Sequence, residues 1–272
     1  MTSLKLAKLT EFVGAEVLDV DQDTILHDES FPAACRQALE DNGVLVFRNL
    51  FLDDELQSTF CEKLGPIQRL MVIVSQDKEK STTFNYLKGT FEWHMDGTVE
   101  AGTDVPNKAT MLSAHGVAEK GGETEFASTY AAYDQLTDAE KEQFGKMRAM
   151  HSLLAKHRRL FPDLSKELEE FWGGMPEREH PLVWSRRDGR NSLVIGATAS
   201  HIVGMDFDEG RALLEDLQAR ATKPECVYQH KWALGDTVIW DNTGVLHRAR
   251  PYDMPSPREL HRTTILGNEA IA

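Results

Sequence analysis

The stretch Asp236-Thr-Val-Ile-Trp-Asp-Asn-Thr-Gly-Val-Leu-His247 places a histidine just beyond a short apolar segment with the character of a β-strand. It belongs to a series of such segments, each bounded by turn residues. The series comprises Ala109–Ala114, Thr124–Ala127, Leu182–Ser185, Ser192–Gly196, Val227–Trp232, Thr237–Trp240 and Thr263–Leu266. An earlier apolar run, Val44–Arg48, is also predicted to be a buried strand.

Helical patterns interrupt this series of strands. The predicted helices are Phe31–Glu40, Asp53–Leu64, Asp138–Met147 and Glu209–Ala221, with a charged insert at Lys156–Trp172. Many short strands with helical insertions predict a mainly β fold with flanking helices, arranged as an antiparallel sandwich or barrel. No long Pro-, Gly- or Ser-rich linker divides the chain, so we expect residues 1–272 to form a single domain.

The composition excludes several classes of protein. The chain has 272 residues, of which 41% are hydrophobic and 27% charged, and its net charge is −14. This acidity disfavours binding to nucleic acid or to an anionic membrane. No run approaches the ~18 apolar residues of a membrane span, and the first residues lack the apolar core of a secretory signal, which predicts a cytoplasmic location. The three cysteines are far apart in the sequence, so we expect any metal to be held by histidine and carboxylate.

Two of the ten histidines lie in unusual surroundings. The first is in Phe91-Glu-Trp-His94-Met-Asp96, and in a strand His94 and Asp96 would project to the same face. The second, His247, is predicted at the mouth of the same barrel. Two imidazoles and one carboxylate on one face of a metal are typical of non-haem Fe(II) oxygenases. A His-x-Asp pair alone is more often a hydrogen-bonded surface pair, so further residues have to support this interpretation.

Arg258 supplies that support, because it follows His247 by eleven residues at the start of an alternating final segment. An arginine that points into an apolar barrel is an uncompensated buried charge unless a carboxylate meets it. A dicarboxylate cosubstrate would supply the carboxylate. The opposing hypothesis is a non-oxygenase metalloprotein of the same fold, either a metal-dependent hydrolase or a ligand-binding protein. Arg258 discriminates between the two, because a hydrolase has no need of a buried cation beside its metal.

The combined motifs resemble one known family. His94-x-Asp96, His247, Arg258, the Gly121-Gly-Glu-Thr124 turn and the Trp-Asp-Asn before His247 are similar to those of the taurine and 2,4-dichlorophenoxyacetate dioxygenase family, which depends on Fe(II) and 2-oxoglutarate. Met111-Leu-Ser-Ala and Ile195-Gly-Ala-Thr-Ala-Ser-His201 resemble the 2,4-dichlorophenoxyacetate branch. The resemblance implies a double-stranded β-helix, or jelly roll, with helices packed outside.

The resemblance also implies a role for each matching residue. His94, Asp96 and His247 would bind Fe(II), the ion at which O₂ reacts, and Arg258 with Thr124 would bind the distal carboxylate of 2-oxoglutarate. Substrate-side residues would be Arg262, opposite the acidic group of the substrate, and His201 and Thr98 in the pocket wall. The implied reaction is hydroxylation of a C–H bond in a small organic acid, such as an aryloxyalkanoate, with release of succinate and CO₂.

Other features carry weaker expectations. Family relatives are commonly dimers or tetramers, so a homo-oligomer is expected. The basic cluster Lys156-His-Arg-Arg159 is interpreted as a solvated face, with a lid over the pocket as the open alternative. His115, His151, His180 and His230 are expected to be structural or surface residues. His261 should point to the opposite face of its strand from Arg262. Met95, Gly97 and Thr98 depart from the pattern of the branch, and Thr198 stands in place of a histidine, which leaves the primary substrate open.

Overall fold

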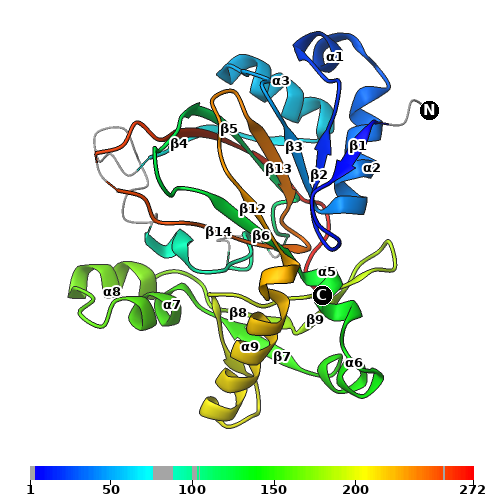
Figure 1. The fold of residues 1–272 in the computed structure, drawn as a ribbon. Coiled ribbons are helices and arrows are strands. Elements are labelled where there is room, and N and C mark those ends of the chain that lie inside the picture. The colour runs from blue at the N-terminus through cyan, green and yellow to red at the C-terminus, as the bar shows by residue number, and fades with distance from the viewer. Residues whose placement is uncertain (1–3, 76–87, 100–102, 104, 254) are drawn as a thin grey trace.

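The computed structural model describes residues 4–75, 88–99, 103, 105–253 and 255–272, which form layers of sheet and helix (Figure 1). The helices are α1 (Gln22–His27), α2 (Phe31–Asn42), α3 (Asp54–Leu64), α5 (Thr129–Asp134), α6 (Asp138–Phe144), α7 (Leu153–Leu160), α8 (Lys166–Gly173) and α9 (Phe207–Ala221), with 3-10 turns η1 (Lys88–Phe91) and η2 (Pro224–Cys226). The strands are β1 (Leu6–Lys8), β2 (Ala15–Val17), β3 (Val44–Phe47), β4 (Ile67–Val74), β5 (Ala109–Gly116), β6 (Thr124–Ser128), β7 (Arg148–His151), β8 (Arg178–Pro181), β9 (Val183–Ser185), β10 (Asn191–Leu193), β11 (Ala199–Ile202), β12 (Val227–His230), β13 (Thr237–Asp241), β14 (Val245–Ala249) and β15 (Glu259–Ile265).

Two sheets face each other at the centre of the molecule. The larger has the strand order β1-β2-β3-β13-β5-β15-β4, and the smaller has the order β12-β6-β14. Strand β13 pairs antiparallel with both β3 and β5, and β14 pairs antiparallel with β6. The exception in the larger sheet is the parallel pair β2 and β3. Strands β11-β7-β8 and the hairpin β9-β10 form two further small sheets beside this sandwich.

Alternation along the strands explains the layers, because successive side chains of a strand point to opposite faces. In the larger sheet, Leu45 and Ile239 pack with helices α1 to α3 on the outer face. Val46 and Trp240 pack on the inner face, in one cluster with Phe126 of the smaller sheet. The larger sheet is therefore buried on both faces, which requires the nearly continuous apolar runs that the sequence shows.

The smaller sheet has its own helical cover. Ala127 and Leu246 lie on its outer face, in a cluster that includes Leu214 and Leu217 of α9. Helices α5 and α9 lie against this side in Figure 1, away from α1 to α3. None of the helices in the described part of the chain is long and apolar enough to cross a membrane.

Two predicted helices differ from the observed ones. The segment Asp138–Met147 is helical only as far as Phe144, where Gly145 caps α6, and the chain then enters β7. The insert Lys156–Trp172 is two helices, α7 and α8, that meet around Phe161. The break has a local cause, because Pro162 disfavours helical geometry in the residue before it.

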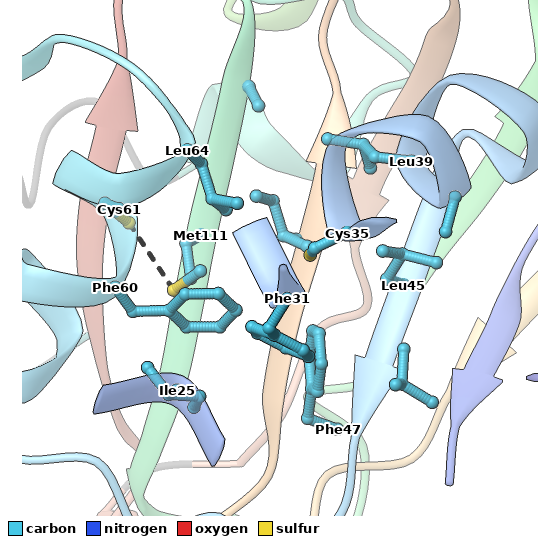
Figure 2. Packing of buried hydrophobic residues seen from close by; sticks show 14 of the residues in the cluster. Ile25, Phe31, Cys35, Leu39, Leu45, Phe47, Phe60, Cys61, Leu64 and Met111 are labelled. Atoms are coloured by element: carbon cyan, nitrogen blue, oxygen red, sulfur yellow. Dashed lines mark hydrogen bonds between the residues drawn. The ribbon is translucent and has the colours of Figure 1, made fainter. Parts of the chain in front are cut away.

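Three phenylalanines anchor the helices on the larger sheet (Figure 2). Phe60 of α3 is fully buried, and its ring centroid lies 5.7 Å from that of Phe31 and 5.5 Å from that of Phe47.

We expect Phe60→Ala to lower the free energy of unfolding by about 3–5 kcal/mol, because a large cavity is left in a closely packed cluster. Urea denaturation measures this loss. The control is Phe171→Ala on α8, which is 53% exposed and should change stability by about 0.5 kcal/mol or less. Equal losses for the two variants would contradict the packing argument.

Candidate metal centre and active-site cavity

His94 and His247 lie directly opposite each other, although they are far apart in the sequence. The His94 amide donates to the His247 carbonyl (3.1 Å), and the His247 amide donates to the His94 carbonyl (2.9 Å). This reciprocal pair is the antiparallel bridge in which both side chains point to the same side. The two ring centroids are 4.2 Å apart. Strand β14 thus positions His247 directly and His94 through the bridge.

Asp96 completes a cluster of three possible metal donors. Its Oδ1 lies 3.8 Å from Nε2 of His94 and 3.8 Å from Nε2 of His247, and all three donor atoms lie within 4.8 Å of one another. Nδ1 of His94 is 2.7 Å from the carbonyl oxygen of Glu92. Because a carbonyl only accepts, Nδ1 carries the proton, and the lone pair on Nε2 is left facing the cluster.

The local conformation around Asp96 differs from the strand predicted for this segment. Apart from the single bridge at His94, the segment forms a turn. Gly97 has φ +89°, and a Cβ at this position would lie 2.6 Å from Cβ of Pro106. The turn and the bridge, rather than the pleat of a strand, bring Asp96 beside His94. The predicted proximity is confirmed, while the predicted reason for it is wrong.

The electrostatic state of the cluster suits a divalent cation. Burial lowers the pKa of His94 well below its ordinary value and that of His247 to about 4. Burial alone would raise the pKa of Asp96, but the Arg262 guanidinium, whose Nη2 donates to Oδ2 at 2.7 Å, helps to hold it well below the usual range. Neutral imidazoles and an ionised carboxylate are the forms that bind metal. This donor set therefore fits Fe(II).

Arg258 lies in the same cavity, buried to 4% exposure. Its Nε donates to the Gly122 carbonyl (3.1 Å), and its guanidinium lies 5.0 Å from the Tyr252 ring centroid. Burial lowers its pKa, while Tyr252 and the Glu123 carboxylate act in the opposite direction. None of the ion pairs among the described residues involves Arg258. Gly122 has φ +76°, and a Cβ there would lie 2.9 Å from Cδ of Arg258, so only glycine leaves room for this side chain.

The cavity has a volume of about 140 Å³ and lies between the two facing sheets and the segments beside them. Its charged lining residues in the described part of the chain are Asp96, Lys156, Arg258 and Arg262. Thr124 also lines it, and its Oγ1 accepts a hydrogen bond from Trp232 Nε1 (3.0 Å). The apolar lining comes from Val72, Val74, Phe91, Leu112, Trp240 and Ala249. A cavity with three cations, one carboxylate and an apolar wall is suited to small organic anions.

Thr98 and His201 lie outside the set of described residues that line this cavity. Thr98 is buried, and its Oγ1 is 2.9 Å from Oγ1 of Thr198. Its carbonyl oxygen is 2.7 Å from Nε2 of His180. His201 is half-buried, with Nδ1 3.2 Å from Oγ of Ser200. Thr98 therefore ties the turn after Asp96 to the neighbouring sheet, and a direct role of either residue in substrate binding stays a prediction.

Lys156 is the residue whose position differs most from its predicted surroundings. It is 5% exposed and lines the cavity, whereas the sequence predicts a solvated face or a lid for the basic cluster. The residues of the cluster do not share one environment, because Arg158 is exposed and pairs with Glu169. Helical spacing carries a signal for this difference, since Lys156 is three residues after the buried Leu153 and shares its face.

A second group of metal-binding residue types lies elsewhere, formed by Asp54, His115 and His261. Nδ1 of His261 is 2.5 Å from Asp54 Oδ1, and its Nε2 is 3.2 Å from Glu259 Oε1. Both ring nitrogens of His261 therefore already face carboxylates, and Asp54 and His115 are exposed.

The prediction that His261 and Arg262 point to opposite faces of β15 is confirmed. His261 contacts Asp54 of α3, whereas Arg262 lines the cavity.

Comparison with known proteins decides the family. The profile of the family described as taurine catabolism dioxygenase TauD, TfdA family matches residues 5–264. The chain belongs to this family. It is 35% identical over 255 residues to an alpha-ketoglutarate-dependent 2,4-dichlorophenoxyacetate dioxygenase of Burkholderia sp. (strain RASC), covering 84% of this chain and 83% of the relative. It is 31% identical to a (S)-phenoxypropionate/alpha-ketoglutarate-dioxygenase of Delftia acidovorans, covering 98% of this chain and 96% of the relative.

A solved structure agrees with these relatives. The crystal structure of AAD-2 in complex with Mn(II) and N-oxalylglycine aligns with a TM-score of 0.84 at 31% identity, covering 99% of this chain and 100% of that one. The jelly-roll fold is thereby confirmed. The chain is an Fe(II)- and 2-oxoglutarate-dependent dioxygenase that uses O₂. These findings favour the oxygenase over the hydrolase or ligand-binding alternative.

Removal of a residue that only supports a metal ligand typically lowers metal affinity by about 10–100-fold, and removal of the ligand itself costs more. We therefore expect His247→Ala and Asp96→Asn each to weaken Mn(II) binding by at least about a hundredfold. Titration followed by the electron paramagnetic resonance of free Mn(II) measures the affinity. The matched control is His115→Ala, which removes an imidazole from the second group and should leave the affinity unchanged. The reverse pattern would place the metal at Asp54, His115 and His261.

Proposed function

We propose that His94, Asp96 and His247 hold Fe(II), and that Arg258 and Thr124 bind the distal carboxylate of 2-oxoglutarate. We further propose that the enzyme hydroxylates a C–H bond of a small organic acid, with release of succinate and CO₂. The observation that carries this proposal is the buried guanidinium of Arg258, which has no carboxylate partner among the described residues and shares a cavity with the three donors.

Neighbouring groups fix two of the three proposed ligands. The Glu92 carbonyl fixes the tautomer of His94, and Arg262 keeps Asp96 ionised and oriented. When bound, the iron supplies redox chemistry that couples reduction of O₂ and decarboxylation of 2-oxoglutarate to oxidation of an unactivated C–H bond. These three residues would hold the metal, and the cavity that they line would take the cosubstrate and the substrate.

Arg258 is suited to a carboxylate that arrives with a ligand. Its planar guanidinium can donate two parallel hydrogen bonds, which a lysine cannot do. Gly122 and the Tyr252 ring fix the guanidinium without neutralising it. A buried cation without a partner destabilises the folded protein. Binding of the cosubstrate carboxylate would remove this penalty.

Arg262 and the apolar lining support the proposed substrate class. Nε of Arg262 is buried without a hydrogen-bond partner among the described residues, so a donor remains for an acidic group after the pairing with Asp96. Val74, Leu112 and Phe91 offer contact to an apolar body. An aryloxyalkanoate-type carboxylate combines these two features, and relatives of the chain act on 2,4-dichlorophenoxyacetate and (S)-phenoxypropionate by their names.

Two further expectations belong to this proposal. The enzyme is proposed to act as a homo-oligomer, a dimer or a tetramer, in the cytoplasm. Support for the assembly comes from the family resemblance. Sedimentation equilibrium and cell fractionation test them separately.

The first test of the function uses the purified protein. Fe(II) and 2-oxoglutarate added without oxygen should produce a weak visible charge-transfer band. With oxygen, succinate release should rise on addition of one member of a panel made of 2,4-dichlorophenoxyacetate, 2-phenoxypropionate, octyl sulfate and taurine. We expect a carboxylate to be the best member. A folded protein that gives neither the band nor succinate would contradict the proposed function.

The second test concerns the cosubstrate. We expect Arg258→Gln to raise the 2-oxoglutarate concentration needed for half-maximal turnover by about one to two decades, because a lost charge-assisted pair costs ~1.5–3 kcal/mol. Gly122→Ala should also raise it, since the added Cβ would displace Arg258. Gly189→Ala is the matched control, because Gly189 has φ +87° but a Cβ added there would have nothing within 4 Å. An equal effect of the two glycine substitutions would contradict the steric argument.

A further inference from the structure

Lys156 brings a third positive charge into the cavity, from the middle of α7. The side chain is 5% exposed, and its Nζ has no hydrogen bond or ion pair with any of the residues that the structure describes. The ammonium lies against Gly89 of η1, where a Cβ would come within 3.2 Å of Nζ and 3.4 Å of Cε. The absence of a side chain at position 89 therefore makes the room in which this ammonium lies.

The helix that carries Lys156 is fixed to the rest of the molecule. The Ser152 hydroxyl caps α7, and the Ser152 amide donates to the Thr198 carbonyl (2.9 Å). Nη2 of Arg159 donates to the Ala197 carbonyl (2.9 Å). Next to Lys156, the His157 ring stacks on Trp172 of α8, with ring centroids 3.9 Å apart. Lys156 is therefore presented from a rigid support rather than from a loop.

The other two cations of the cavity each contact a carboxylate, if the proposed function holds. Arg262 pairs with Asp96, and Arg258 is reserved for the distal carboxylate of 2-oxoglutarate. The second carboxylate of 2-oxoglutarate and Asp96 would together offset the two charges of Fe(II), which leaves the charges of both Arg262 and Lys156 in excess. Of these two, Arg262 donates a hydrogen bond to Asp96, whereas Lys156 is attracted by Asp96 and Glu92 but has no hydrogen bond or ion pair with any residue in the described part of the chain. A buried ammonium without a partner is costly, so an anion that enters with the substrate is its natural complement.

We propose that Lys156 binds the anionic group of the primary substrate and makes the enzyme selective for acids over their neutral analogues. This inference rests on the proposed function and adds a specificity-determining residue to it. The charged end of the substrate would face α7, while its apolar body would contact the strands at Val74 and Leu112. Arg262 would assist from β15, with part of its charge already opposed by Asp96.

The protonation of Lys156 is compatible with this role. Burial lowers its pKa to about 8, against the opposing attraction of Asp96 and Glu92. The side chain is therefore still mostly charged at neutral pH, and a bound anion would favour the charged form further.

The test compares an acid with its amide in the Fe(II)- and 2-oxoglutarate-loaded enzyme. The probes are the panel carboxylate that gives the fastest succinate release and its primary amide, which keeps the reacting carbon and removes the charge. We expect Lys156→Gln to raise the KM for the acid about tenfold to a hundredfold, as for other charge-assisted pairs. The KM for the amide and for 2-oxoglutarate should change less than about twofold. Lys156→Arg should recover part of the loss, and Lys166→Gln on α8, an exposed lysine, is the control.

The possible outcomes distinguish failure of the role of Lys156 from failure of the proposed function. Equal increases in KM for acid and amide, or an unchanged KM for the acid, would overturn the role of Lys156 while the wild-type succinate release still supports the proposed function. If Lys156→Gln does not fold, Lys156→Met replaces it, because it preserves the length and apolar stem of the side chain. No succinate release by the folded wild type with any panel member would overturn the proposed function itself.

Discussion

The site depends on one backbone interaction, the reciprocal pair of hydrogen bonds between His94 and His247. Strand β14 belongs to the smaller sheet. The segment around His94 has no other strand pairing among the described residues. It is attached through this bridge and through the hydrogen bond that the Ala197 amide donates to the Trp93 carbonyl. Gly196 allows that attachment, because its φ of +114° and missing Cβ let the His94 backbone approach closely. With the bridge in place, the turn at Gly97 brings the third donor beside the two imidazoles.

A second constraint is the balance of charge in the cavity. Three cations face a single carboxylate among the described lining residues. Such an arrangement is unfavourable without ligands, because buried charges need partners. A divalent metal adds to the excess, and a dicarboxylate cosubstrate and an anionic substrate offset it. The cavity therefore favours the binding of anions. Packing of the helices outside the sandwich stabilises the fold against the unfavourable energy of these buried charges.

Sequence patterns predicted the sandwich because most of its central strands are apolar or alternating runs that are bounded by turn residues. They missed strands such as β1, β7 and β11, which have three or four residues each. Segments of that length have too few positions to show a period, and their pairing comes from neighbours distant in the chain. The split between α7 and α8 was local in origin, since Pro162 marks it, but the pattern of charge on both sides concealed it.

The sequence by itself determined which residues are proposed to carry the chemistry, because a His-x-Asp pair, a later histidine and an arginine eleven residues beyond it form a combination whose chemical requirements are specific. Tertiary structure alone decided how these residues meet and which others join them. Lys156 has the same charge as its exposed neighbour Arg158, and the packing of α7 against the sandwich places one in the cavity and the other in solvent. Thr98 and His201 lie in other surroundings for the same reason, since the direction of a side chain is set by contacts between segments that the sequence does not bring together.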